Sequence, residues 1–183
     1  MLLVVLQILW FFLPALSANL APVFAARYNW WPQLDLPLDG GKTLSGRSIL
    51  GSHKTLRGLI IGIIIGSIVG LIQYILQSQT LIAGISIITY PSALMAAAIG
   101  ALIGFGALFG DAIKSFCKRR LNISPGTSWI PWDQIDVVVG VIIVTFWFAP
   151  LNFNQIIISL FVVGIGMYLS SVIGVYLKIK KSL

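Results

Sequence analysis

The sequence contains little charge, no glutamate, one histidine and one cysteine. Only 9% of its 183 residues are charged, whereas 58% are hydrophobic; ordinary soluble domains carry roughly 25% charged residues. The single cysteine excludes an internal disulfide framework, and one histidine with one cysteine is too few for a usual zinc site. The absence of glutamate leaves little for a glycosidase pair, and the lone histidine little for a Ser-His-Asp triad. No GxxxxGK[ST] motif is present, so phosphate-loop chemistry is not indicated.

Long uncharged stretches indicate a membrane protein. Residues 1–26, 58–110 and 137–177 carry no charged side chain. A transmembrane helix needs about 20 apolar residues, so these stretches have room for one, two and two helices. We therefore predict an all-α integral membrane protein with one domain over residues 1–183. The predicted spans cover about residues 2–25, 58–76, 92–110, 132–149 and 156–177.

The charged segments between these spans predict the topology. Each stretch that holds two spans returns the chain to the side it left, so segments 27–57, 111–136 and 178–183 face the same side. The positive-inside rule makes that side the cytoplasm, with the N-terminus outside and the protein in the plasma membrane. The net charge of +7 then reflects topology and anionic lipid rather than nucleic acid. The first segment lacks the basic start of a signal peptide, which favours a retained helix.

Small residues recur at four-residue intervals in three of the predicted spans. This spacing aligns them on one helix face and predicts close packing against another helix. The cytoplasmic loop 27–57 is instead rich in proline, glycine, aspartate and serine, which argues against a regular element there. The small residues are Gly58, Gly62, Gly66 and Gly70 in the second span, Gly100, Gly104, Gly106 and Gly110 in the third, and Gly166, Ser170 and Gly174 in the fifth.

Residues 106–140, GALFGDAIKSFCKRRLNISPGTSWIPWDQIDVVVG, hold three of the five aspartates between apolar runs. If the third helix continues past the membrane surface, Asp111, Lys114, Ser115 and Lys118 share one face. Asp133 and Asp136 are three apart and share a face of the fourth helix. Residues 137–149 are too few to cross about 30 Å, so that helix begins near Pro131 or Trp132. Carboxylates at this depth need a cation or a basic side chain as partner.

This set of residues suits phosphate chemistry with magnesium. Mg²⁺ takes one or two carboxylates together with substrate phosphates and water, and lysine and arginine can hold the remaining phosphate charge. One alternative for the aspartates is structural pairing with Lys114 or Arg119, and one for Lys118 and Arg119 is a basic membrane anchor. A small cation transporter is a further alternative, but it predicts ionisable residues in the middle of the spans.

The motifs GSHKTLRG, GDAIKSFCKRRLNI and PWDQID resemble those of the CDP-archaeol synthase family, which is related to phosphatidate cytidylyltransferases. The resemblance implies that CMP is transferred from CTP to a membrane lipid phosphate, a digeranylgeranylglyceryl phosphate in that family, with Mg²⁺ and release of pyrophosphate. It makes Asp111 and Asp133 magnesium ligands, with Asp136 as a third acidic ligand that supports them. These three aspartates and Lys118 are the catalytic candidates.

The resemblance also assigns residues to the nucleotide. Lys118 and Arg119 would contact the triphosphate with Arg120 beside them, and Lys54 and Thr55 match a KTxxG motif near the nucleotide. Thr55 is equally suited to cap a helix. The remaining candidates for substrate or nucleotide binding are Arg57, Lys114 and Ser115. The roles of His53 and of the turn Asp39–Gly41 stay open.

Two neighbouring families fit less well. Pro131 and Trp132 precede Asp133, and Gln134 stands where diacyl phosphatidate enzymes have arginine, so the archaeol branch is the closer match. Asp39-Gly40 lacks the Ala-Arg that follows in CDP-alcohol transferases.

Overall fold

The computed structural model describes residues 1–124 and 127–176, and these residues are mostly helical. The predicted basic tail, with Lys178, Lys180 and Lys181, lies outside the described residues, as do Pro125 and Gly126. In chain order the elements are α1 (Leu2–Arg27), η1 (Pro32–Leu34), β1 (Thr43–Leu44), β2 (Arg47–Ser48), α2 (Leu56–Leu76), α3 (Thr80–Ile85), α4 (Ala93–Arg120), α5 (Trp132–Thr145) and α6 (Phe153–Tyr176).

Within the described residues, α1, α2, α4 and α6 are long and apolar enough to cross a membrane. This confirms an all-α multi-pass membrane protein. The fourth predicted span begins at Trp132 as expected, but α5 has only 14 residues, or about 21 Å of helix. The count of five spans and the topology built on it therefore stay predictions. Helix α4 continues through Arg120, so residues 111–120 are helical rather than part of a loop.

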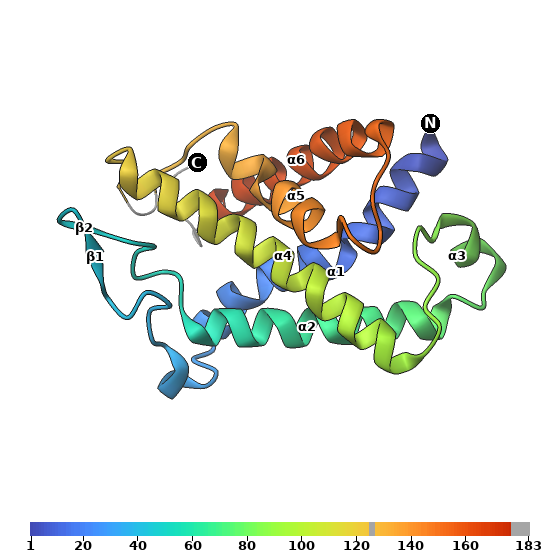
Figure 1. Ribbon diagram of the computed structural model, residues 1–183, viewed down its shortest axis with the longest axis horizontal. Coiled ribbons are helices and arrows are strands. Elements are labelled where there is room, and N and C mark those ends of the chain that lie inside the picture. Colours follow the sequence, from blue (N-terminus) through green and yellow to red (C-terminus); the bar gives the residue numbers. More distant parts are fainter. Residues whose placement is uncertain (125–126, 177–183) are drawn as a thin grey trace.

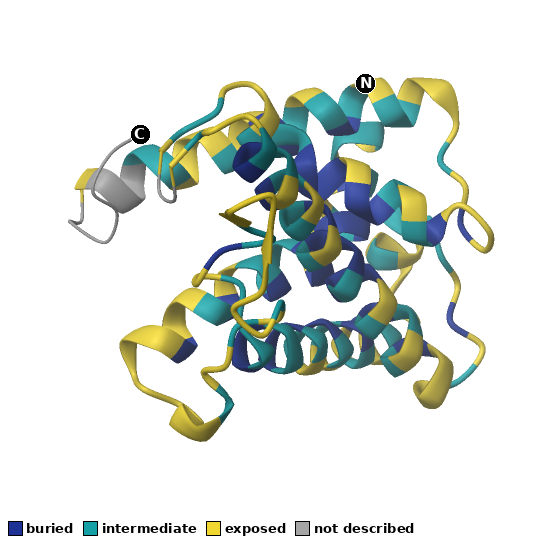
Figure 2. Ribbon diagram, turned by 60° about the vertical axis from the view of Figure 1, so that its left-hand side comes forward, coloured by how far each residue is buried: buried dark blue, intermediate teal, exposed yellow. Residues whose placement is uncertain are grey.

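The interior lies between α1, α4, α5 and α6. Its fully buried side chains include Phe12 of α1, Ile103 of α4 and Val141 of α5. Figure 2 shows this buried material gathered between the helices, with exposed residues on their outer faces. Many of the exposed side chains are large and apolar, such as Ile64 and Ile68 of α2. An outer surface of this kind is suited to lipid rather than water.

Helices α2 and α4 pack through glycine, as predicted. A Cβ atom added at Gly66 would lie 2.6 Å from the backbone carbonyl oxygen of Gly100, and one at Gly100 would collide in turn with Gly66 and Gly70. The two backbones can approach this closely only because these positions carry no side chain. The small-residue face of the fifth predicted span is not packed within the described residues, since Gly166 and Ser170 of α6 are exposed, so a contact at this face stays a prediction. Helix α6 instead turns Val163 inward.

The loop between α1 and α2 is more ordered than the sequence predicted. Strands β1 and β2 form a short antiparallel hairpin. Ser45 and Gly46 both have positive φ, which is the backbone that a tight two-residue hairpin turn requires. Figure 1 shows the hairpin at one end of the helices and α3 at the opposite end. The hairpin lies at the charged end of α4.

Candidate functional site

A second glycine contact joins the charged end of α4 to the start of α5. A Cβ atom at Gly110 would collide with the backbone carbonyl of Asp136, and one at Gly140 with the backbones of Gly106 and Gly110. Asp111 follows Gly110 directly. This contact therefore fixes Asp111 close to Asp136 across the helix pair.

Three carboxylates converge on one ammonium group. Lys114 Nζ lies 3.0 Å from Asp111 Oδ1, 3.0 Å from Asp133 Oδ1 and 2.7 Å from Asp136 Oδ2. The side chain of Asp136 is only 4% exposed, and that of Lys114 is 14% exposed. Charges shielded from water interact much more strongly than charges at a surface. The acidic faces that we expected on α4 and α5 therefore meet. The ion pairing of the aspartates with Lys114, which was the alternative to a catalytic role, is also present.

Two further lysines complete this cluster. Lys54, which precedes α2, pairs with Asp111 Oδ2. Lys118 Nζ lies 2.7 Å from Asp133 Oδ1 and donates a hydrogen bond of 2.8 Å to the carbonyl of Thr127. Three lysines thereby offset three aspartates, which allows the cluster to lie close to the apolar interior. We call Asp111, Asp133, Asp136, Lys54, Lys114 and Lys118 the charged cluster.

The loop before α2 covers one side of this end of α4. Asp39 accepts hydrogen bonds from the backbone N–H groups of Leu50 (2.8 Å), Gly41 (2.9 Å) and Gly51 (3.3 Å). The Leu50 hydrogen bond, supported by the other two, lowers the pKa of the Asp39 carboxyl below its ordinary value. Gly51, with φ of +93°, faces the side chain of Arg119. Asp39 therefore organises the loop, which supports a turn rather than a phosphate cradle at Asp39–Gly41.

The adjacent arginines have different surroundings. Arg120 donates hydrogen bonds to the carbonyls of Leu44 (2.8 Å) and Ser48 (2.8 Å) and so ties the hairpin to α4. The Nε atoms of both arginines are buried without a partner among the described residues, but Arg119, which is 9% exposed, also lacks the hydrogen bonds that the terminal nitrogens of Arg120 make within those residues. A buried donor without a partner is costly, so Arg119 is the one of the two that is suited to an anionic ligand.

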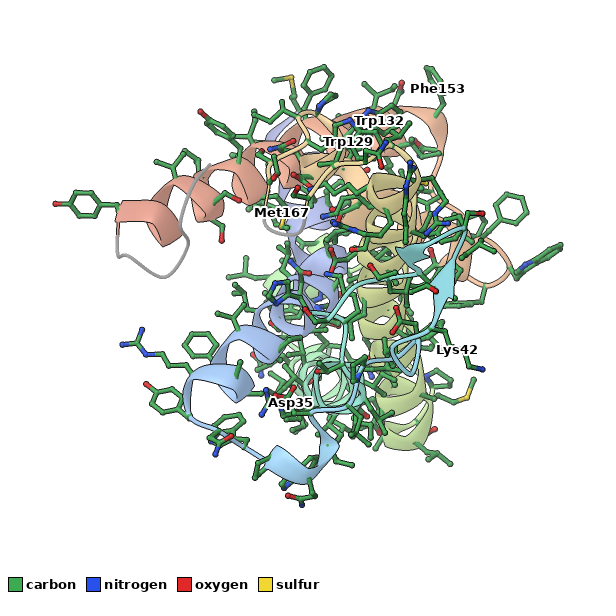
Figure 3. The ribbon with its side chains drawn as sticks, turned by 90° about the vertical axis from the view of Figure 1, so that its left-hand side faces the viewer. Asp35, Lys42, Trp129, Trp132, Phe153 and Met167 are labelled. Carbon is green, nitrogen blue, oxygen red and sulfur yellow. The ribbon has the colours of Figure 1, made fainter. Side chains whose placement is uncertain are left out.

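The other predicted binding residues have local partners. Thr55 Oγ1 accepts a hydrogen bond from the Gly58 N–H group and caps α2. This is the helix-capping role that was the alternative to nucleotide binding. Ser115 donates to the backbone carbonyl of Asp111 one turn earlier. Arg57 pairs with Asp35 at 2.9 Å. Figure 3 faces the hairpin end of the molecule and labels Asp35 well below Trp129; among the described residues Arg57 forms its ion pair with Asp35 and not with a carboxylate of the charged cluster.

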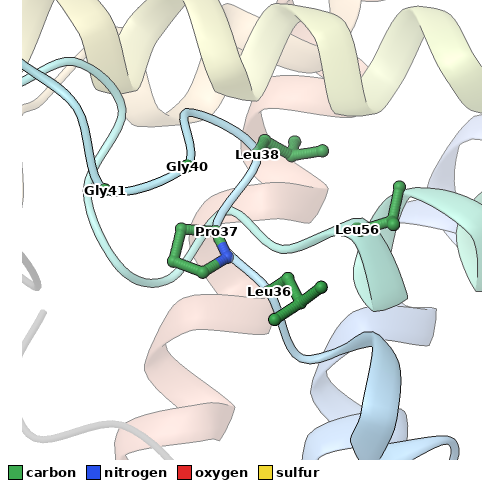
Figure 4. Close-up of a pocket in the computed structure, with 6 residues that line it drawn as sticks. All are labelled: Leu36, Pro37, Leu38, Gly40, Gly41 and Leu56. Atoms are coloured by element: carbon green, nitrogen blue, oxygen red, sulfur yellow. The ribbon is translucent and has the colours of Figure 1, made fainter.

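An open pocket of about 450 Å³ lies beside the start of α2 (Figure 4). Its lining is mainly apolar, and none of the predicted site residues contributes to it. Triphosphate oxygens need cationic and N–H donors, so this pocket is not their place. His53, in the same loop, is exposed. The lining residues are Leu36, Pro37, Leu38, Gly40, Gly41 and Leu56.

The donor set of the charged cluster fits a hard divalent cation. All three acidic groups offer carboxylate oxygens, the ligands that Mg²⁺ prefers. Although Lys114 and Lys118 lie within 3.0 Å of it, Asp133 Oδ1 is buried and accepts no hydrogen bond of good geometry from the described residues. The surrounding lysines and Arg119 can hold several phosphate groups. The arrangement is chemically able to bind a metal and a polyphosphate side by side.

Some supporting contacts could not be found in the sequence. The backbone carbonyl of Thr127 and the N–H of Trp129 hold Lys118 and Asp133, respectively, and backbone groups leave no residue-type signal. Arg47 donates a hydrogen bond to the carbonyl of Arg120, and no motif in the sequence indicated this contact. The Asp111–Lys114 pair, by contrast, follows from their spacing on a helix.

Comparisons with known proteins agree over nearly the whole chain. The family model described as CarS-like CDP-archaeol synthase matches residues 1–182. The CDP-archaeol synthase of Methanosarcina barkeri is 39% identical, with 91% of this chain and 98% of the relative covered. That of Methanocaldococcus jannaschii is 37% identical, with 94% and 93% covered. A solved structure of an intramembrane enzyme for archaeal membrane lipids biosynthesis gives a TM-score of 0.72 at 28% identity, with 90% and 92% covered.

Proposed function

The chain belongs to the CDP-archaeol synthase family, and from that premise we propose that the charged cluster between α4 and α5 is its active site. The protein is a CTP-dependent lipid cytidylyltransferase, a nucleotidyltransferase that forms a CDP-lipid. The observation that carries the assignment of the site is the convergence of Asp111, Asp133 and Asp136 on one point. Cations that suit a triphosphate surround that point.

The acceptor in this proposal is a digeranylgeranylglyceryl phosphate. One of its phosphate oxygens attacks the α-phosphorus of CTP, and a new P–O bond forms. The bond from that phosphorus to the oxygen that bridges to the β-phosphate breaks, and pyrophosphate leaves with the electron pair. The attacking oxygen is already ionised, so the reaction needs no general base. This agrees with a chain that has one exposed histidine and no glutamate.

The three aspartates would hold Mg²⁺ through their carboxylate oxygens. When bound, the ion offsets charge on the phosphates and steadies the leaving oxygen. The convergence of one oxygen from each aspartate within 3.0 Å of a single point, Lys114 Nζ, supports this role. The residues themselves orient the reaction: α4 presents Asp111 and α5 presents the other two carboxylates from the opposite side.

The triphosphate would lie between the loop before α2 and the end of α4. Lys54 approaches from the loop, and Lys118 and Arg119 approach from α4. Arg119 has the strongest case, because it is buried and, unlike Arg120, its guanidinium is not engaged by backbone carbonyls of the described residues. Arg120, Arg57 and Thr55 support the scaffold instead, through the hairpin, Asp35 and the cap of α2.

The lipid phosphate and CTP meet at the cytoplasmic face of the plasma membrane in this proposal. All seventeen charged side chains (12 basic and 5 acidic) fall in three segments that the charge pattern assigns to one side. The apolar outer faces of the helices are suited to deliver a lipid from the bilayer. The nucleotide would arrive from the aqueous side.

Pyrophosphate release by the full chain in detergent tests the proposal. The mixture contains CTP, Mg²⁺ and either a digeranylgeranylglyceryl phosphate or a diacyl phosphatidate. We expect release that requires a lipid, favours CTP over ATP and is faster with the isoprenoid ether. Asp133→Asn should reduce it by at least about 100-fold, because an interaction with developing charge is lost.

Asp35→Asn is the matched control, since Asp35 pairs with Arg57 and not with a lysine of the charged cluster. Its rate should stay near that of the wild type. If Asp133→Asn and Asp35→Asn lost the same fraction of the pyrophosphate release rate while both proteins were folded, the charged cluster would not be the active site. A preference for diacyl phosphatidate would reassign the acceptor. No pyrophosphate release with either lipid, from folded protein, would contradict the proposed reaction and favour the cation-transport alternative.

A further inference from the structure

Lys114 has a position that no other lysine of the described residues shares. Its Nζ contacts an oxygen of all three aspartates at 2.7–3.0 Å. Lys54 pairs only with Asp111, and Lys118 only with Asp133. Within residues 1–124 and 127–176, Lys114 is therefore the single ammonium that links the carboxylate of α4 to both carboxylates of α5.

Three carboxylates within reach of one point repel one another strongly at low exposure. A positive charge at that point removes the repulsion and ties the two helices together. The Gly110 contact brings the backbones close but contributes no charge of its own. The local structure at this end of α5 therefore depends on a cation among the three aspartates.

The same three oxygens are the proposed ligands of Mg²⁺, whose bonds to oxygen are about 2.0–2.1 Å long. An ammonium group and a metal ion cannot both lie at the point where these oxygens converge. Lysine has a flexible four-carbon stem, so its Nζ can move aside without a shift of the helix. Occupation by one cation then excludes the other.

We propose that Lys114 is a positioning residue that holds the three carboxylates in place and competes with the divalent cation for them. This inference rests on the proposed function, because it takes the aspartates as the metal ligands. Lys114 keeps the α4–α5 junction assembled before the metal enters and weakens the binding of the metal once it does. The metal affinity of the site is thereby set by a side chain that is not a ligand.

The test measures binding of Mn²⁺, as a spectroscopic probe of the Mg²⁺ site, to the full chain in detergent without nucleotide. Electron paramagnetic resonance of free Mn²⁺ gives the dissociation constant. We expect Lys114→Met to bind Mn²⁺ at least tenfold more tightly than the wild type. In the presence of a chelator the same variant should unfold at a lower temperature, and Mn²⁺ should raise its unfolding temperature more than that of the wild type.

Lys42→Met is the matched control, because Lys42 is an exposed lysine of the hairpin loop and should leave both readouts unchanged. Lys114→Gln removes the charge but keeps hydrogen-bond donors. If Lys114→Met does not fold, Mn²⁺ binding is measured with Lys114→Gln instead. Weaker or unchanged Mn²⁺ binding in a folded Lys114 variant would overturn the inference, because a merely structural lysine would not oppose the metal.

A second comparison separates this inference from the proposed function. Asp136→Asn should weaken Mn²⁺ binding if the carboxylates are ligands. If it does so while Lys114→Met changes nothing, only the competition is wrong. If Asp136→Asn leaves Mn²⁺ binding unaltered, the metal site of the proposed function is wrong, and Lys114 is then a structural ion-pair partner alone.

Discussion

The two parts of α4 use the same kind of helix contact for different purposes. From Ala93 to Gly110 the helix carries no charge, and it packs against α2 through Gly100 and Gly104. From Asp111 to Arg120 the helix carries five charged side chains. This charged part begins directly after Gly110, which with Gly106 packs against α5. The first contact joins two apolar helices. The second brings together groups that repel or attract one another strongly.

The difference lies in what the close approach of the backbones achieves. At Gly66 and Gly100 it increases dispersion contacts, which are all that holds apolar helices together in lipid. At Gly110 and Gly140 it also sets the separation between Asp111 and Asp136. A small displacement of the helices would reduce the packing between α2 and α4. Between α4 and α5 it would also change the relative positions of the three carboxylates.

Alanine at matched glycines should separate these purposes. Gly110→Ala would place a Cβ against the Asp136 backbone, and Gly100→Ala would place one against Gly66. Overpacking of this kind costs about 1–3 kcal/mol, so both variants should unfold at lower temperature. Only Gly110→Ala should lose activity per folded molecule, by about 100-fold, because misplacement of about 1 Å has effects of that size.

Thermal unfolding and CTP turnover on the same monodisperse preparations provide the measurement. Gly100→Ala should keep its turnover within about threefold of the wild type once corrected for folded protein. Equal losses of turnover in the two variants would mean that the α2 contact positions the site as much as the α5 contact does.

The adjacent arginines sharpen the comparison on a smaller scale. Arg119→Gln should raise the KM for CTP by about 10- to 100-fold, the range for loss of a hydrogen bond to a charged group, with little change in unfolding temperature. Arg120→Gln should leave KM within about threefold, but it should loosen the hairpin, because the bonds to Leu44 and Ser48 are lost. Steady-state kinetics and hydrogen exchange at residues 43–48 measure the two effects.

The opposite result would assign CTP binding to Arg120 rather than to Arg119. If Arg120→Gln raised KM and Arg119→Gln did not, the hairpin contacts would be secondary and the triphosphate would lie nearer the loop. A rise in both would indicate that the hairpin has to be held in place for CTP to bind.

Periodicity and charge predicted the parts of this structure that depend on one helix at a time. The start of α5 near Trp132 followed from the length that a span requires, and the shared face of Asp111 and Lys114 followed from helical spacing. The glycine face of α2 was likewise confirmed, since Gly66 packs on Gly100. Membership of the family also followed from motifs that the comparisons confirm.

Features that depend on a partner segment could not be predicted in this way. The small-residue pattern of α6 is as regular as that of α2, yet Gly166 is exposed, because no helix of the described part of the chain covers that face. The convergence on Lys114 needs two helices at a defined crossing, which spacing within one helix does not determine. The role of Asp39 depends on backbone N–H groups eleven and twelve residues later.

The smallest effect we expect concerns that loop and its dependence on pH. The pKa of Asp39 is lowered from its ordinary value of 3.8, first by the Leu50 hydrogen bond. The folded loop therefore prefers the ionised form, so its contribution is complete above that value and is lost as pH falls through the lower pKa of the folded state. Hydrogen exchange at Leu50 and Gly51, corrected for the intrinsic rate, should show protection that declines at acidic pH.

Asp39→Asn should lower this protection at neutral pH and remove most of its pH dependence, since an amide does not ionise in this range. The matched control is Asp35→Asn, which removes a carboxylate of the same loop that pairs with Arg57 instead. If Asp35→Asn removed the pH dependence and Asp39→Asn did not, the ion pair at the start of α2 would organise the loop. The cover over Arg119 would then depend on α2 rather than on the turn at Asp39.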